Sequence, residues 1–273
     1  MDPIRQALER ARAKDSASQG NPSDPFAPFP SSVVHEHTDF QEVKLNAAHL
    51  ESTRIVGYNP LHESGRSFDM LRTQVLQTMD DNGWQILAVT SPTSGCGKSV
   101  TACNLAMSIA RLPERSVLLV DLDLHKPKVA EYLGISAKSG ILSVLEGRTS
   151  FLNAIVRASI AQNQTLVLPG EVCKAGAAEW MASQAMTTTL QALKREFRSH
   201  VIILDMPPVL VGDDVISILR QIEAILLITS VGTSTVPDIK ECYKHIKSTP
   251  VVRVVVNKVS EKTESYYYGY GYN

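Results

Sequence analysis

Short and almost wholly apolar segments alternate with helical ones along most of this chain. The apolar segments are rich in Val, Ile and Leu and cover residues 84–91, 116–124, 165–170, 200–207, 223–232 and 251–259. Runs of this length and composition are typical of parallel strands that are covered on both faces. The helical segments cover residues 64–80, 98–111, 176–197, 214–222 and 236–248. This alternation predicts an α/β fold with a doubly wound, mainly parallel sheet and right-handed crossovers.

Both ends of the chain lack this alternation. Residues 3–13 have the pattern of a short helix, and residues 14–42 contain prolines scattered among Ser, Asp and Asn. A segment of that kind buries too little apolar surface to fold by itself, so we expect a short helix plus a flexible linker over residues 1–45. The main domain is expected over residues 46–260. Residues 261–273 are rich in Tyr and Gly and predict a disordered tail.

A phosphate-binding loop follows the first apolar run. The strand leads into SPTSGCGKSV, and a helix begins within this stretch. Small residues let backbone N–H groups turn toward a phosphate, the lysine reaches the β- and γ-phosphates, and the serine hydroxyl binds Mg²⁺. The usual motif begins with Gly five residues before Gly97, where this chain has Pro92. The residues expected to hold the nucleotide are Thr93, Ser94, Gly95, Cys96, Gly97, Lys98, Ser99 and Val100.

Carboxylates follow two of the apolar runs. Asp121 and Asp123 stand two residues apart after one run, so both side chains point to one side of the chain. Asp205 ends another run, before a Pro207-Pro208 pair that forces an extended exit. Open α/β sheets bind ligands at the carboxyl ends of their strands, where these groups and the loop converge. Metal-assisted phosphoryl transfer needs acidic groups there, although each aspartate taken alone has an alternative role in a turn or helix cap.

Composition narrows the functional classes. Apolar residues make up 44% of the chain, charged residues 20%, and the net charge is −1, which predicts a globular domain that binds no nucleic acid. The four scattered cysteines form no CxxC pair, so a disulfide framework and a zinc site are both disfavoured. The N-terminus lacks a signal-peptide pattern, and no apolar run approaches the roughly 18 residues of a membrane span. We therefore expect a cytoplasmic chain with no membrane span of its own.

These motifs together resemble the bacterial tyrosine autokinases of capsule and exopolysaccharide synthesis, within the deviant Walker-A P-loop ATPases. The resemblance covers roughly residues 50–273. It is carried by the loop at residues 91–99, VLLVDLDLHKP at 117–127, and VIILDMPPVLVGDD at 201–214. Further matching segments are LVLPGE, VVVNKV and the tyrosine cluster at the C-terminus.

The resemblance implies ATP and Mg²⁺ as cofactors. It implies that Lys98 contacts the phosphates, that Ser99 binds the metal and that Asn257 lies beside the adenine. It further implies that Asp121 is the base or positioning group for a tyrosine hydroxyl. Asp123 and Asp205 are expected to support the metal, directly or through water. The implied catalytic group is Lys98, Asp121, Asp123 and Asp205, and the implied metal group is Ser99, Asp121, Asp123 and Asp205.

The tyrosine cluster YYYGYGYN ends the chain and holds five of its eight tyrosines. The resemblance implies a protein-tyrosine kinase that autophosphorylates this tail and regulates exopolysaccharide or capsule synthesis or export. It also implies a homo-oligomer with transfer between subunits, and a membrane-embedded activator of the chain-length-determinant kind that recruits the kinase to the inner face of the membrane. The alternative reading of the cluster is a disordered, sticky tail. The expected phosphoacceptors are Tyr266, Tyr267, Tyr268, Tyr270 and Tyr272.

Two other functions stay open. The first is a nucleotide-switched ATPase of the positioning or partition type, but Thr93 replaces the signature lysine of that branch. The second is a weakly active nucleotide-binding scaffold. It is suggested by His125 in place of the arginine usual in the kinases, and by a helix that reads Arg66, Asp69 and Arg72 where the kinases carry Glu-x-x-Arg-x-x-Arg. Arg66 and Asp69 are expected to form a local i,i+3 pair on a solvated helix face.

Overall fold

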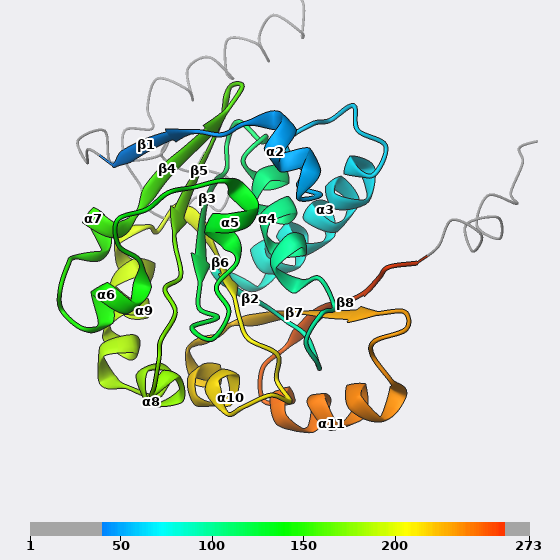
Figure 1. The fold of residues 1–273 in the computed structure, drawn as a ribbon. Coiled ribbons are helices and arrows are strands. Elements are labelled where there is room, and N and C mark those ends of the chain that lie inside the picture. The colour runs from blue at the N-terminus through cyan, green and yellow to red at the C-terminus, as the bar shows by residue number, and fades with distance from the viewer. Residues whose placement is uncertain (1–39, 260–273) are drawn as a thin grey trace, which may run out of the picture. The chain divides into compact units, whose positions relative to one another are not determined.

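A computed structural model describes residues 40–259 of the chain. Within these residues a single eight-stranded sheet has the order β1-β4-β5-β3-β6-β2-β7-β8 (Figure 1). Every neighbouring pair is parallel except β4 and β5, which are antiparallel. The mainly parallel, doubly wound sheet predicted from the sequence is confirmed. The strands are β1 Gln41–Lys44, β2 Ile86–Thr90, β3 Ser116–Asp121, β4 Val156–Ile160, β5 Asn163–Leu168, β6 His200–Asp205, β7 Ala224–Ser230 and β8 Val251–Asn257.

Helices cover both faces of the sheet. One face is packed by α2 Ala47–Ser52, α3 Gly65–Asn82, α4 Lys98–Ile109 and α5 Val129–Leu133. The other face is packed by α6 Ile141–Leu145, α7 Phe151–Ala154, α8 Ala177–Met181, α9 Gln184–Glu196, α10 Asp214–Ile218, the 3₁₀ turn Leu219–Gln221 and α11 Val236–Ile246. Figure 1 shows α4 between the sheet and α3, and α8, α10 and α11 along the opposite side. The result is a three-layer arrangement with the sheet in the middle.

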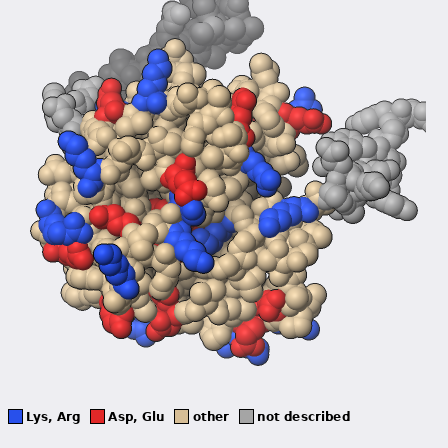
Figure 2. Space-filling view, in the orientation of Figure 1, with Lys and Arg blue, Asp and Glu red and all other residues tan. Residues whose placement is uncertain are grey.

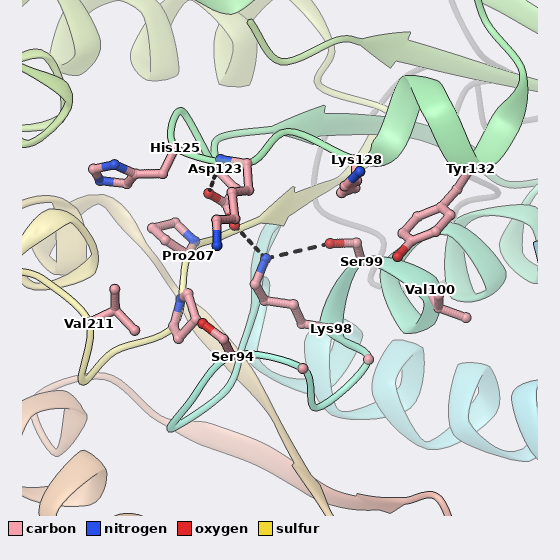
Figure 3. A pocket seen from close by; sticks show the side chains of 14 residues that line it. Ser94, Lys98, Ser99, Val100, Asp123, His125, Lys128, Tyr132, Pro207 and Val211 are labelled. Carbon is pink, nitrogen blue, oxygen red and sulfur yellow. Dashed lines mark hydrogen bonds and ion pairs between the residues drawn. The ribbon is translucent and has the colours of Figure 1, made fainter. Parts of the chain in front are cut away.

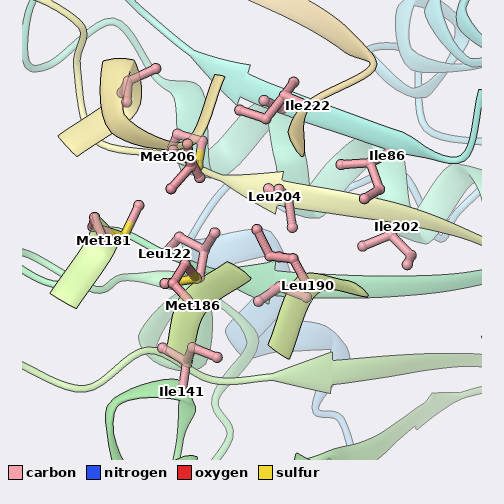
Figure 4. Close-up of a cluster of buried hydrophobic side chains, with 14 of the residues drawn as sticks. Ile86, Leu122, Ile141, Met181, Met186, Leu190, Ile202, Leu204, Met206 and Ile222 are labelled. Carbon is pink, nitrogen blue, oxygen red and sulfur yellow. The ribbon is translucent and has the colours of Figure 1, made fainter. Parts of the chain in front are cut away.

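Successive side chains of the central strands pack alternately into the two halves of the hydrophobic core, one on each face of the sheet. In β2, Ile86 and Ala88 pack on the face of α9, whereas Leu87 and Val89 pack on the face of α4. Successive side chains of a strand point to opposite faces, so a strand that is apolar throughout contributes side chains to the core on each face. Figure 4 shows the α9-side cluster, where Leu190 lies among side chains from the sheet and the neighbouring helices.

Two strands were not predicted. β4 is not a continuous apolar run, because only its alternate residues are buried, namely Val156, Ala158 and Ile160. It forms a hairpin with β5 through Ala161, whose φ of 52° lies in the left-handed region. β1 consists of QEVK, a mostly exposed edge strand. Residues 41–44 were assigned to the linker, so the expected start of the folded part at residue 46 is too late.

The helix predicted over residues 176–197 is two helices. Ser183 lies between α8 and α9, and its hydroxyl accepts a hydrogen bond from the backbone N–H of Met186 at 3.1 Å. A serine with extended backbone that bonds forward in this way caps a new helix. The predicted helix over residues 214–222 likewise tightens into a 3₁₀ turn after Ile218.

The predicted helix at residues 3–13, most of the linker and the tyrosine tail lie outside the described residues. Their assignment as separate parts of the chain therefore stays a prediction. Within residues 40–259, no helix has the length and apolar content needed to cross a bilayer.

Candidate nucleotide-binding site

The loop between β2 and α4 has the backbone of a phosphate-binding loop. Gly95 and Gly97 have φ values of 81° and 89°, a region that side chains other than glycine rarely adopt. A Cβ on Gly97 would lie 2.3 Å from the amide nitrogen of Asn257. That amide donates to the carbonyl of Cys96 at 3.0 Å, and Lys258 Nζ donates to the carbonyl of Gly95 at 2.7 Å. The end of β8 therefore holds the outward-facing carbonyls of the loop.

Lys98 extends from the first turn of α4 toward the carboxyl ends of β3 and β6. Its Nζ lies 2.7 Å from Asp123 Oδ2 and 3.9 Å from Asp205 Oδ1. The same ammonium lies 3.5 Å from the hydroxyl of Ser99 (Figure 3). The prediction that the loop and these strand ends converge is confirmed by these distances. An ammonium between two carboxylates beside a phosphate loop is in position to exchange a carboxylate for a phosphate.

Asp121 has a different environment from the other two aspartates. One of its oxygens accepts hydrogen bonds from the backbone N–H groups of Lys128 and Val129 at 2.9 and 3.0 Å. The other accepts from the N–H of Asp123 at 3.1 Å. Like the side chain of Asp205, that of Asp121 is completely buried and does not line the pocket. Asp121 thus fixes the loop that carries Asp123 and the start of α5, which is the helix-cap alternative left open by the sequence.

Burial shifts the protonation of these groups. Desolvation, reinforced by the charge of Asp205, raises the pKa of Asp121 to about 8, against the backbone hydrogen bonds and Lys98. Desolvation also raises the pKa of Asp205 to about 6, although the charge of Lys98 opposes the rise. For Lys98, desolvation lowers the pKa, but Asp205 and Asp123 together outweigh it and the net pKa is raised. The lysine therefore stays charged, and its ammonium interacts with the carboxylates of both Asp123 and Asp205.

An open pocket lies over the loop. Its lining brings together Ser94, Gly95, Gly97, Lys98, Ser99, Val100, Asp123, His125, Lys126, Lys128, Tyr132, Pro207, Pro208 and Val211. Most residues predicted to bind the nucleotide are in this set. Thr93 and Cys96 are not in it. The thiol of Cys96 points inward and donates to the carbonyl of Thr93 at 3.2 Å. Asn257 also stays outside the lining, so its place beside an adenine remains a prediction.

Several lining residues were not assigned from the sequence. His125 Nε2 lies 3.1 Å from Asp214 Oδ1, and Asp214 is almost fully buried. Lys126, Lys128 and Tyr132 also line the pocket. The signal was present in part, because His125 and Asp214 both lie in segments that match the kinases, but their contact joins residues 89 positions apart. Only the folded chain shows that pairing.

Magnesium fits one part of this site. Both carboxylate oxygens of Asp205 are buried and accept no hydrogen bond within the described residues, which is costly unless a cation binds there. In residues 40–259, no group of three or more His, Cys, Asp or Glu side chains is arranged to hold a metal alone. Mg²⁺ commonly takes one or two protein ligands and completes its shell with phosphate oxygens and water. Ser99 and Asp205 suit that pattern, whereas the oxygens of Asp121 are occupied.

The helix that reads Arg66, Asp69 and Arg72 makes internal contacts. Asp69 Oδ1 accepts from Arg72 at 3.2 Å, from Arg111 at 2.8 Å and from the hydroxyl of Ser108 at 2.7 Å. The predicted i,i+3 pair between Arg66 and Asp69 is therefore wrong. Asp69 pairs instead with Arg72, with Ser108 near the end of α4 and with Arg111 just after it, because it faces α4.

Comparison with known proteins shows the family of the chain. Residues 87–268 match the CobQ/CobB/MinD/ParA nucleotide binding domain. The chain belongs to this family. The curated relatives include a putative tyrosine-protein kinase EpsB of Ralstonia nicotianae, which is 32% identical over 248 residues. That alignment covers 90% of this chain but 32% of the relative, so the chain spans about a third of its length. The resemblance to bacterial tyrosine kinases predicted from the sequence is confirmed.

Solved structures confirm the fold. The chimerical protein CapA2B2 superposes with a TM-score of 0.69 at 21% identity, over 81% of this chain and 94% of that one. The septum site-determining protein MinD of Pyrococcus horikoshii, solved with Mg-ADP, superposes with a TM-score of 0.54 at 22% identity, over 65% and 72% of the two chains. The fold is thus shared with both CapA2B2 and MinD.

Proposed function

We propose that this chain is an ATP- and Mg²⁺-dependent protein-tyrosine kinase that phosphorylates its own C-terminal tyrosines. The observation that carries the proposal is the position of Lys98, between Asp123 and Asp205 at the mouth of a phosphate loop. The kinases among the relatives support the choice of tyrosine as acceptor. Regulation of exopolysaccharide or capsule synthesis follows from the same relationship.

The residues of the loop account for nucleotide binding. The backbone N–H groups around Gly95 and Gly97 and the first turn of α4 favour a polyphosphate, because they present unpaired donors and the positive end of the helix dipole. Lys98 exchanges Asp123 for the β- and γ-phosphates. Ser99 and Asp205 would hold Mg²⁺, which neutralises charge on the transferring group.

Transfer requires an acceptor oxygen in line with the γ-phosphate. The phenol oxygen forms a bond to phosphorus while the bridging bond to the β-phosphate breaks, and the electron pair leaves on ADP. Asp123 is the pocket carboxylate that becomes available when Lys98 moves to the phosphates, so it takes the phenol proton. Asp121, tied to three backbone N–H groups, positions the loop that carries Asp123. This assignment changes the base implied by resemblance alone.

The acceptors and partners belong to the same proposal. The tyrosines at positions 266, 267, 268, 270 and 272 are the expected acceptors, and a neighbouring subunit is the expected donor. Basic and acidic side chains are interspersed over the face seen in Figure 2, with no broad basic surface there, which supports a protein substrate over a nucleic acid. A membrane-embedded activator would recruit the cytoplasmic kinase to the inner face of the membrane.

One experiment tests the proposal. The full chain is incubated with ATP and Mg²⁺, with and without a candidate activator segment, and phosphotyrosine is mapped by mass spectrometry. We expect phosphate on the tail tyrosines, and its loss in Lys98→Met and in a chain that ends at Ser260. Release of inorganic phosphate without phosphotyrosine would favour the positioning ATPase. Tail phosphorylation that survives Lys98→Met would disprove the assigned site.

A further inference from the structure

One end of the pocket is lined by a group of apolar side chains. Pro207, Pro208 and Val211 form this end, which we call the proline–valine shelf. Figure 3 shows Val211 and Pro207 at the same end of the pocket as His125, away from Tyr132. The remaining lining residues are mostly charged or hydroxylated groups and loop backbone. A triphosphate with its metal interacts with those polar groups, and the adenine is expected beside Asn257, so the apolar end is left to another group.

Backbone hydrogen bonds fix the shelf to the phosphate loop. The N–H of Val209 donates to the carbonyl of Ser91 at 2.9 Å, and the N–H of Leu210 donates to that of Pro92 at 3.1 Å. The hydroxyl of Thr90 donates to the carbonyl of Pro207 at 2.7 Å. Two consecutive prolines add stiffness because their φ angles are restricted. The shelf therefore keeps a constant position relative to a bound phosphate.

The exposed surface of the shelf comes mainly from Val211. Val211 is 63% exposed, whereas Pro207 and Pro208 beneath it are buried. Covering exposed apolar surface is worth about 25 cal/mol per Å². A flat apolar group that lay against the shelf would gain this energy and would sit beside the end of the phosphate chain.

We propose that the proline–valine shelf binds the phenol ring of the acceptor tyrosine and selects tyrosine over serine and threonine. This inference rests on the proposed kinase function and names the residues that determine its acceptor. The occupant is a tail tyrosine of residues 266–272, the part of the chain in which five aromatic side chains follow one another closely. A tyrosine ring spans the shelf and carries its hydroxyl past Val211 toward the γ-phosphate. A serine or threonine hydroxyl, one bond beyond Cβ, leaves the shelf uncovered and its oxygen short of the phosphate.

The test measures acceptor affinity separately from nucleotide affinity. The full chain and its Val211→Ser variant phosphorylate a synthetic peptide of residues 260–273, and mass spectrometry distinguishes the peptide from the protein. We expect Val211→Ser to raise KM for the peptide by about fivefold, about 1 kcal/mol at 1.4 kcal/mol per factor of ten, while KM for ATP changes by less than twofold. Val211→Leu, which keeps an apolar shelf, restores KM for the peptide to within about twofold of the wild-type value.

A matched control uses Val236, a valine of similar exposure, 64%, that does not line the pocket. Val236→Ser should leave both KM values at the wild-type level. An unchanged KM for the peptide in Val211→Ser, with an active wild-type kinase, overturns the shelf but leaves the kinase assignment intact. An equal rise of both KM values also overturns it, because the residue would then act through the nucleotide. A wild-type chain that phosphorylates no tyrosine would instead remove the proposed function.

Discussion

Asp205 imposes a conflict between stability and function that substitution should reveal. The side chain is fully buried, and its pKa rises from 3.8 to about 6. At 1.36 kcal/mol per pKa unit, the rise corresponds to about 3 kcal/mol of destabilisation when the group is ionised. Asp205→Asn removes that cost, which already includes the attraction of Lys98, but it buries a neutral amide in place of the carboxylate. We therefore expect the nucleotide-free variant to be about 1–2 kcal/mol more stable than the wild type at pH 8.

The pH dependence follows from the sign of the shift. An acid whose pKa is raised by folding costs nothing while it is protonated in both states, so wild type and variant should converge below about pH 4. The cost appears as the pH rises above 3.8 and is complete above about 6. Thermal unfolding followed by circular dichroism between pH 4 and pH 8 measures this difference. For a domain of this size, 1 kcal/mol corresponds to about 2–4 °C in Tm.

Nucleotide should reverse the order of stability. A Mg²⁺-bound ATP analogue at 100 times its Kd stabilises the wild type by about 2.7 kcal/mol, whereas Asp205→Asn lacks the metal-binding carboxylate and gains little. Asp81→Asn, at an exposed position on α3, serves as a control and should stay within about 0.5 kcal/mol. Lower stability of nucleotide-free Asp205→Asn at pH 8, or equal stabilisation of both proteins by the analogue, would refute the reasoning.

Three further predictions concern the loop, the helix pair and the core. Gly97→Ala should weaken binding of a fluorescent ATP analogue at least tenfold by anisotropy, because residue 97 has a positive φ and the added Cβ displaces the amide of Asn257; unchanged affinity would contradict the loop geometry. Asp69→Ala should lower the free energy of unfolding by about 1–3 kcal/mol in urea titrations, since Arg111 and its neighbours lose their shared acceptor. Phe197→Ala should cost about 3–5 kcal/mol in the same assay because its side chain is 1% exposed.

The sequence predicted the parts of the fold whose physical signal is local. A central parallel strand is apolar at every position because both faces are covered, so β2, β6 and β7 were readable as short runs of Val, Ile and Leu. β1 carries almost no apolar signal and exists because its backbone pairs with β4. Helices of five residues, such as α5 and α6, are shorter than a readable helical period. Their existence depends on tertiary contacts that no local pattern records.

The candidate site, like the fold, has features that the sequence predicts and features that only the structure shows. Convergence of Lys98 with the strand-end carboxylates follows from topology, because parallel strands bring their carboxyl ends to one edge. The individual roles do not follow, since they depend on which oxygen faces which neighbour. Asp121 and Asp123 are two residues apart on the same side of the chain, yet the first bonds only to backbone N–H groups and the second pairs with the lysine.

That difference gives the nucleotide-free site a defined resting arrangement. Lys98 is held by Asp123 at 2.7 Å, so a nucleotide must replace a buried ion pair rather than fill an empty position. Breaking such a pair is costly unless each charge finds a new partner. The phosphates would supply a partner for Lys98, and a metal would pair with the carboxylate of Asp205, which accepts no hydrogen bond within residues 40–259. Binding of phosphate and metal should therefore be cooperative, because phosphate alone would draw Lys98 away and leave the carboxylates of Asp123 and Asp205 without a cation.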